Sequence, residues 1–332
     1  MTLLGLPLAT DCDAIRRSRR GVTLLSGFLG SGKTTLLRNE LDRAGDESIA
    51  VIVNDFCETI FDDVLKNVNG EHSVVLSGGC VCCTRRDDLA RALAGLLDAE
   101  QRGNTPRSDH IVIETSGLSD PGPVAFTIAN DPVLKHHYVL ARVCVTVDAL
   151  TGMDSIERHE IALRQLLAAD DVIVTKADLV SPETVDSLVR RLHEFNPSAT
   201  VSVTAIGDLL RREEPSGVTA SGRPDIQLDS GAVNTSAIST LELATDEQLD
   251  WQAFSVWLSL LLHRYGPHVL RVKAVLDVRD VGSVALNGVQ HIVHRPEHLT
   301  GSVRPGSRIV LIVNSIDTEL LRQSFHTFLS IN

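Results

Sequence analysis

The sequence predicts a doubly wound α/β fold with a largely parallel sheet, followed by a smaller α+β domain. In the first two thirds of the chain, short runs rich in Val and Ile alternate with helical patterns. The runs are apolar without alternation, as expected for strands that are buried on both faces. Together these observations indicate βαβ units. The expected strands are 22–26, 49–53, 74–76, 110–114, 142–148, 171–175 and 200–203.

The remaining pattern divides the chain into further parts. Residues 1–20 form an N-terminal extension, and residues 21–206 form the α/β domain. Residues 207–236 show Gly, Pro and charged residues without periodicity, so we expect a linker there. Residues 237–332 form the α+β domain, with helices expected at 251–263 and 318–329 and strands at 238–243, 269–278, 283–293 and 308–313.

Composition narrows the class of protein. The 332 residues are 43% hydrophobic and 22% charged, which is typical of a globular protein, and the formal net charge is −12. A negative balance argues against a general nucleic-acid or anionic-membrane binder, because both need a positive field. No apolar run approaches the roughly 20 residues that span a bilayer, and arginines follow the short apolar start rather than precede it. We expect a cytoplasmic protein whose six cysteines are thiols.

A phosphate site is predicted directly after the first expected strand. Residues 27–34 match G-x-x-x-x-G-K-[ST] and lead into a helical pattern, which is the context of a P-loop. Glycines let successive amides turn toward the phosphates, Lys33 reaches the β- and γ-phosphates, and the Thr34 hydroxyl binds Mg²⁺. The alternative is a glycine-rich turn without a ligand. The residues expected at the nucleotide are Gly27, Gly30, Ser31, Gly32, Lys33, Thr34 and Thr35.

A carboxylate for the magnesium ion is predicted at the end of another strand. Residues 110–114 are apolar until Glu114, and Gly117 follows closely, where its amide could approach a γ-phosphate. A surface glutamate at a strand end is the alternative. Beside a P-loop, Glu114 is the expected ligand of the Mg²⁺ water shell.

The choice of base is read from the end of the strand at 171–175. Asp178 can accept hydrogen bonds from guanine N1–H and the exocyclic amine, which adenine cannot offer together. Lys176 would lay its aliphatic stem along the base. Thr175 stands where the usual GTPase pattern has Asn. A plain Lys-Ala-Asp turn is the alternative.

Three closely spaced cysteines predict a second metal site. Cys80, Cys82 and Cys83 follow two glycines and can gather around one soft or borderline ion, with water, a client ligand or Glu58 as the fourth ligand. Zn²⁺ is the favoured ion, with Co²⁺ and Fe²⁺ as alternatives. A redox-active cluster and small core side chains are the other interpretations. Cys144 lies within an expected strand and is predicted to be core.

The four motifs together resemble one family. Gly-Phe-Leu-Gly-Ser-Gly-Lys-Thr-Thr, Gly-Gly-Cys-x-Cys-Cys, Glu-Thr-Ser-Gly-Leu-Ser-Asp-Pro and Thr-Lys-Ala-Asp occur in this order, as in the CobW-type metallochaperone GTPases. That family includes nitrile hydratase activators and zinc-transfer chaperones. The resemblance covers nearly the whole chain, and residues 238–329 look like the family's C-terminal domain. It implies a P-loop NTPase fold and GTP hydrolysis coupled to metal insertion into a client metalloprotein. We expect the intrinsic hydrolysis to be slow, because the sequence identifies no arginine finger or water-positioning residue.

The resemblance also implies roles for single residues. Lys33, Thr34 and Glu114 would serve catalysis, and Asp55 lies in a segment that links nucleotide state to metal state. Asp55 is one methylene shorter than the family's usual Glu, and Cys57 replaces a Gly. The rival function is a nucleotide-dependent regulator of a partner enzyme with a structural or redox cysteine site. The sequence leaves the oligomeric state, the client and the residue that activates water open.

Overall fold

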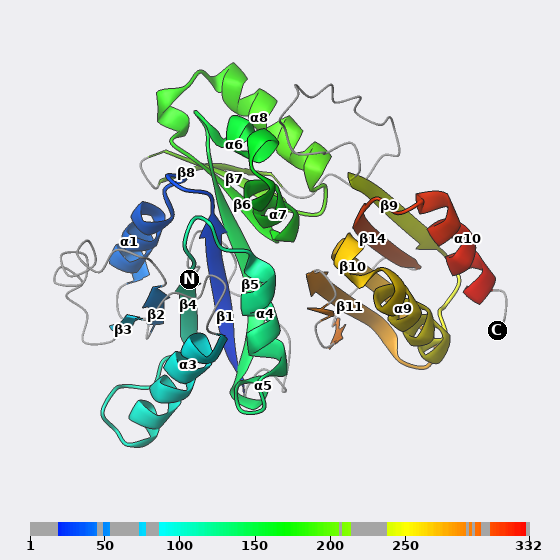
Figure 1. Cartoon of the computed structure of the whole chain (residues 1–332), viewed down its shortest axis with the longest axis horizontal. Helices are drawn as coiled ribbons and strands as arrows, with labels where there is room; N and C mark the ends of the chain where they lie inside the picture. Colours follow the sequence, from blue (N-terminus) through cyan, green and yellow to red (C-terminus); the bar gives the residue numbers. More distant parts are fainter. Residues whose placement is uncertain are drawn as a thin grey trace. The chain divides into compact units, whose positions relative to one another are not determined.

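The computed structural model describes residues 19–44, 49–53, 73–77, 86–205, 208–213, 238–289, 292–293, 296–299 and 306–329. The chain divides into two compact units, Met1–Ser216 and Gly217–Asn332 (Figure 1). In the described parts, no helix is both long enough and apolar enough to cross a bilayer.

The first unit is built on an eight-stranded sheet with the order β3-β2-β4-β1-β5-β6-β7-β8. Strands β1 to β7 pair in parallel and β8 is antiparallel to β7, so the predicted doubly wound, largely parallel sheet is confirmed. The strands are β1 (Arg20–Gly27), β2 (Ile49–Val53), β3 (Ser73–Ser77), β4 (His110–Glu114), β5 (Tyr138–Asp148), β6 (Asp171–Thr175), β7 (Thr200–Ala205) and β8 (Asp208–Glu213).

Helices connect these strands and bury both faces of the sheet. Leu24 and Leu25 are adjacent in β1 and are both fully buried. Leu25 packs in one cluster with Leu36 and Leu37 of α1, and each fully buried leucine contributes about 2 kcal/mol of transfer free energy. The helices are α1 (Lys33–Ala44), α3 (Arg86–Gln101), α4 (Pro121–Asn130), α5 (Leu134–His137), α6 (Gly152–Arg158), α7 (Glu160–Ala168) and α8 (Pro182–Phe195).

The start of α8 shows how local sequence sets an element. The Ser181 side chain accepts a hydrogen bond from the Thr184 amide at 3.3 Å, and Pro182 occupies the first helical position. The first amides of a helix have no backbone partners within it. Ser181 accepts from one of them, and Pro182 has no N–H that would need a partner.

Strand β8 corrects one expectation. Asp208–Glu213 lies in the segment 207–236 that was expected to be a linker, and it pairs antiparallel with β7. Its sequence, Asp-Leu-Leu-Arg-Arg-Glu, neither alternates nor forms an apolar run, so it gave no strand signal. Such a charged sequence is tolerated at the edge of a sheet, where a strand need not be buried on both faces. An antiparallel edge strand on a parallel sheet is a common arrangement.

The second unit is an antiparallel sheet with two helices on one face. The strand order is β12-β11-β10-β14-β9, and β13 pairs with β11. Alternate residues of β10, among them Val272 and Leu276, pack in one core with Trp257 of α9 and Phe325 of α10, as the α+β prediction requires. The elements are β9 (Ile238–Thr245), α9 (Trp251–Tyr265), β10 (Val269–Val278), β11 (Gly282–Val289), β12 (Ile292–Val293), β13 (Glu297–His298), β14 (Ser307–Asn314) and α10 (Thr318–Leu329).

One strand of this unit differs from the expectation. Residues 283–293 were predicted as a single strand, but β11 ends at Val289 and β12 returns antiparallel to it. Gly288 pairs with Val293 and Val289 pairs with Ile292, so the chain reverses between Val289 and Ile292. The two residues between the paired positions, Gln290 and His291, are not typical turn formers, so the sequence gives little signal of this reversal.

Candidate nucleotide site

The sheet order brings the predicted motifs to one edge. Strand β1 lies between β4 and β5, and β5 lies beside β6. Because all four strands are parallel, their carboxyl ends meet at the same edge. In open α/β sheets, ligands bind in the crevice at this edge, where the direction of strand connections reverses.

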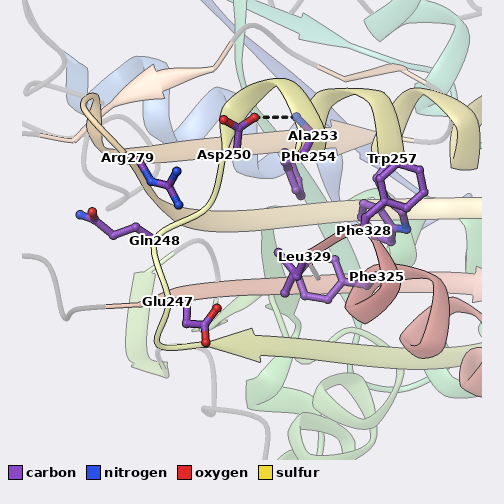
Figure 2. Close-up of a pocket in the computed structure, with 10 residues that line it drawn as sticks. All are labelled: Glu247, Gln248, Asp250, Ala253, Phe254, Trp257, Arg279, Phe325, Phe328 and Leu329. Atoms are coloured by element: carbon purple, nitrogen blue, oxygen red, sulfur yellow. Dashed lines mark hydrogen bonds between the residues drawn. The ribbon is translucent and has the colours of Figure 1, made fainter. Parts of the chain in front are cut away.

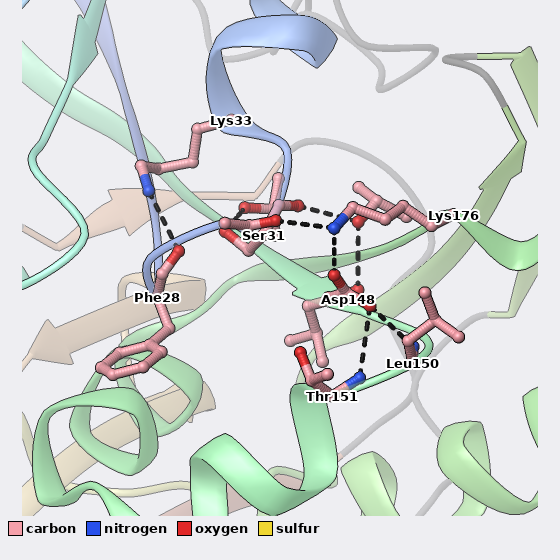
Figure 3. A network of polar contacts seen from close by, with 11 residues as sticks. Phe28, Ser31, Lys33, Asp148, Leu150, Thr151 and Lys176 are labelled. Carbon is pink, nitrogen blue, oxygen red and sulfur yellow. Dashed lines mark hydrogen bonds and ion pairs between the residues drawn. The ribbon is translucent and has the colours of Figure 1, made fainter.

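The phosphate loop follows β1 and is shaped by its glycines. Gly30 and Gly32 have φ angles of 72° and 88°, which side chains rarely adopt. The Lys33 ammonium donates to the Gly27 carbonyl at 2.8 Å. It also donates to the Phe28 carbonyl at 3.2 Å, as Figure 3 shows. The ammonium therefore lies across the loop, and the side chain is buried.

The predicted magnesium ligands meet at the start of α1. The Thr34 hydroxyl donates to Glu114 Oε1 at 2.6 Å, and Glu114 is only 2% exposed. The register of β1 on β4 explains the contact, because Leu25 pairs with Glu114 at the ends of the two strands. Thr35, on the next helix position, is exposed.

Gly117 lies against the phosphate loop. A Cβ atom added at Gly117 would lie 2.7 Å from the Leu29 backbone nitrogen, so only glycine allows the loop to approach this closely. The Gly117 carbonyl accepts a hydrogen bond from the Gln165 side chain of α7 at 3.2 Å. The segment after β4 is thereby fixed between the loop and α7.

The segment predicted to recognise the base is joined directly to the phosphate loop. The Thr175 hydroxyl donates to the Ser31 carbonyl at 2.8 Å, and both residues are buried. Lys176 has a left-handed backbone with φ 57°, and its ammonium donates to the Gly30 carbonyl at 2.9 Å. Asp178 lies in the 3-10 helix η2 (Ala177–Leu179) and is exposed, so its carboxylate is accessible to a ligand.

Two residues near the end of β5 contact the candidate site and were not predicted. The Thr146 hydroxyl lies 2.6 Å from the Ser31 hydroxyl, and the Asp148 carboxylate forms an ion pair with the Lys176 ammonium (Figure 3). In the sequence, these two residues are marked only as polar residues near the carboxyl end of an expected strand. They can be assigned to the site only when β5 is known to lie between β1 and β6.

Two family models match the chain. The nucleotide-binding domain of the CobW/HypB/UreG model matches residues 21–203, more than half of the chain, and the C-terminal domain model of the cobalamin synthesis protein CobW matches residues 238–329. The chain belongs to the CobW/HypB/UreG family. The resemblance seen in the sequence and the P-loop NTPase fold are therefore confirmed.

The similar proteins include zinc chaperones. This family member is 32% identical over 316 residues to the zinc chaperone YjiA of Escherichia coli, covering 92% of this chain and 97% of the relative. A Zn(II)-bound structure of the YjiA GTPase from E. coli matches with a TM-score of 0.64 at 28% identity, covering 93% of this chain and 99% of the other. Zinc-regulated GTPase metalloprotein activator 1 of Schizosaccharomyces pombe is 32% identical over 239 residues, 70% of this chain and 57% of that protein.

The predicted cargo-metal residues of this CobW-type chain lie outside the described residues. These are Cys80, Cys82, Cys83 and Glu58, together with Asp55 and Cys57 of the adjoining segment. Within the described ranges, no group of three or more His, Cys, Asp or Glu residues is arranged to hold a metal ion. Cys144, predicted to be core, is a fully buried thiol in β5.

The second unit carries a pocket of about 130 Å³ between α9 and α10 (Figure 2). Its apolar side includes Phe254, Trp257 and Phe325, and its rim includes Glu247 and Arg279. The Trp257 indole donates to the Ser324 hydroxyl at 3.0 Å, so the polar atom of this buried aromatic cluster has a hydrogen-bond partner.

Proposed function

We propose that the chain is a metallochaperone that couples GTP binding and hydrolysis to the transfer of a transition metal to a client metalloprotein. As a member of the CobW/HypB/UreG family, the chain is a GTPase. The observation that carries the proposal is that hydrogen bonds connect the phosphate loop, the expected magnesium ligands and the segment expected to recognise the base. The Thr34 hydroxyl donates to Glu114, and the Thr175 hydroxyl donates to the Ser31 carbonyl of the phosphate loop.

The phosphate end of the site would hold Mg²⁺ and the triphosphate. A hydroxyl and a buried carboxylate, 2.6 Å apart, are the oxygen ligands that Mg²⁺ accepts beside phosphates. When bound, the ion neutralises charge on the β- and γ-phosphates. The Lys33 ammonium, which now contacts two backbone carbonyls, would exchange them for phosphate oxygens and form stronger, charge-assisted bonds.

The base end would select guanine. The exposed Asp178 carboxylate can accept from guanine N1–H and the 2-amino group, and adenine lacks that pair of donors. The stem of Lys176 offers an apolar edge for the base, because its ammonium is held at Gly30. Thr175 takes the place of the usual Asn and ties this segment to the phosphate loop.

The cargo metal would be bound by Cys80, Cys82 and Cys83, with Glu58 as a further ligand. The thiolate set favours Zn²⁺ over Co²⁺ and Fe²⁺ where zinc is available, and the relatives named as zinc chaperones support that choice. GTP with Mg²⁺ would order the segment around Asp55 and complete this site. Hydrolysis would remove the γ-phosphate and release the ion to the client.

The wider context of the function also rests on the sequence. The net charge of −12 supports a protein that acts without nucleic acid or an anionic membrane surface as partner. The cysteine cluster supports a reducing, cytoplasmic setting, because its thiols must stay free to bind metal.

A single substitution tests the guanine assignment. Asp178→Asn presents one acceptor and one donor in place of two acceptors, which matches xanthine, whose C2 carries an oxygen instead of an amine. We expect the variant to lose GTP hydrolysis and gain XTP hydrolysis, measured as phosphate release with Mg²⁺. Asp154→Asn, on the exposed face of α6, is the matched control. If the Asp178 variant kept the wild-type preference for GTP over XTP, the assignment would be wrong.

A double substitution tests the metal site. Cys82→Ser with Cys83→Ser should abolish tight Zn²⁺ binding while far-UV circular dichroism stays unchanged, since a transfer site is not needed for folding. Cys12→Ser is the control for loss of an unrelated thiol. Loss of folding in the double variant would instead indicate a structural metal site.

A further inference from the structure

The end of strand β5 holds a carboxylate that the sequence motifs did not include. Asp148 Oδ1 accepts hydrogen bonds from the amides of Leu150 at 2.6 Å and Thr151 at 3.3 Å, which fixes the side chain in the turn before α6. The Asp148 side chain is only 7% exposed, so its charge interacts in a medium less screened than water.

The second oxygen of this carboxylate contacts the base-recognition segment. Asp148 Oδ2 forms an ion pair with the Lys176 ammonium, as Figure 3 shows. The contact follows from the sheet, because Asp148 pairs with Thr175, the residue directly before Lys176. The same ammonium donates to the Gly30 carbonyl of the phosphate loop at 2.9 Å.

Lys176 needs such anchors because its backbone is strained. It is one of three non-glycine residues with positive φ in the described ranges, at φ 57° and ψ 31°. A left-handed lysine persists only where its surroundings hold it. This conformation starts η2, which carries Asp178 two residues later.

We propose that Asp148 is a positioning residue for guanine recognition. Its carboxylate holds Lys176 in the left-handed conformation with its ammonium over Gly30, so that the lysine stem and the Asp178 carboxylate are preorganised for the base. The inference rests on the proposed GTP-binding function. It adds a residue from β5 to the specificity of that site.

The structural role of Asp148 can be separated from the positioning role. Asp148→Asn keeps an oxygen that accepts from Leu150 and Thr151 but loses the charge that holds Lys176. Asp148→Ala loses both functions. The asparagine variant is therefore the informative one, and its fold can be verified by thermal unfolding followed by circular dichroism.

The experiment compares the binding of a ligand that carries a guanine base with the binding of a ligand that has phosphates only. Binding of fluorescent GDP is measured directly, and inorganic tripolyphosphate is measured by competition, both with Mg²⁺. We expect Asp148→Asn to weaken GDP binding about tenfold, as for loss of a charge-assisted contact, and to change tripolyphosphate binding less than twofold. Asp154→Asn, an exposed partner of Arg158 on α6, should change neither.

A second comparison shows whether Asp148 acts through Lys176. If it does, the double variant Asp148→Asn with Lys176→Ala should bind GDP no more weakly than Lys176→Ala alone. Additive losses in the double variant would overturn the inference. So would unchanged GDP binding in Asp148→Asn, or an equal loss for GDP and tripolyphosphate. A wild-type protein that fails to bind GDP would instead overturn the proposed function itself.

Discussion

The bond between Thr175 and the phosphate loop allows a quantitative prediction. Thr175→Val keeps the size and branching of the side chain but removes the hydroxyl that donates to the Ser31 carbonyl at 2.8 Å. Thr175 is 7% exposed and Ser31 is 3% exposed, so water cannot readily replace the lost donor. A buried acceptor left without a partner costs about 1–3 kcal/mol, and we expect the first unit to lose stability by that amount.

The assay can follow the two units separately. Both tryptophans of the chain, Trp251 and Trp257, lie in the second unit, so their fluorescence reports the unfolding of that unit in urea. Far-UV circular dichroism reports both units. The dichroism transition that fluorescence does not follow is therefore that of the first unit. Thr175→Val should lower the urea midpoint of this transition. Thr175→Ser, which keeps the hydroxyl, should have the wild-type midpoint. Equal midpoints for Thr175→Val and the wild type would show that the hydrogen bond to the Ser31 carbonyl does not stabilise the first unit.

Two further predictions come from other contacts. Gly117→Ala forces a Cβ to within 2.7 Å of the Leu29 backbone, so the phosphate loop must shift and GDP affinity should fall at least tenfold; unchanged affinity in a calorimetric titration would contradict this. Burial lowers the pKa of His110 to about 4, so the unfolded chain takes up a proton near pH 6.5 that the folded chain takes up only near pH 4. Stability should therefore be full above pH 6.5 and fall by up to about 3 kcal/mol toward pH 4; His110→Gln should remove that part of the slope in urea titrations at several pH values.

The sequence predicted the parts of the fold whose signal is local. Strands 49–53, 110–114 and 171–175 were predicted to the residue, because each is a short Val- and Ile-rich run buried on both faces. Strand β5 begins at Tyr138 rather than Arg142. Its first residues pair with the start of β1 across a shift in register between Val22 and Thr23, which the sequence does not reveal. The charged edge strand β8 gave no such signal.

In the candidate site too, the features with a local sequence signal were predicted, and those that depend on tertiary contacts were not. The phosphate loop and the guanine-recognition residues around Asp178 could be predicted because each motif lies within a few positions of the sequence. Asp148 was missed although its strand was predicted, since its role depends on β5 lying beside β6, which strand signals alone do not reveal. The contact of Gly117 with the Leu29 backbone likewise depends on a tertiary approach.

A metal titration of the apo-protein in two nucleotide states tests most directly whether the protein is a nucleotide-gated metal carrier. Zn²⁺ is added in competition with a chromophoric chelator, once with GDP and once with a non-hydrolysable GTP analogue, both with Mg²⁺. We predict tighter Zn²⁺ binding with the analogue, by at least the roughly fivefold that marks a typical coupling between sites, and no such difference in the Cys82→Ser, Cys83→Ser variant. Equal Zn²⁺ affinity in the two states of the wild-type protein would contradict a nucleotide-gated metal carrier.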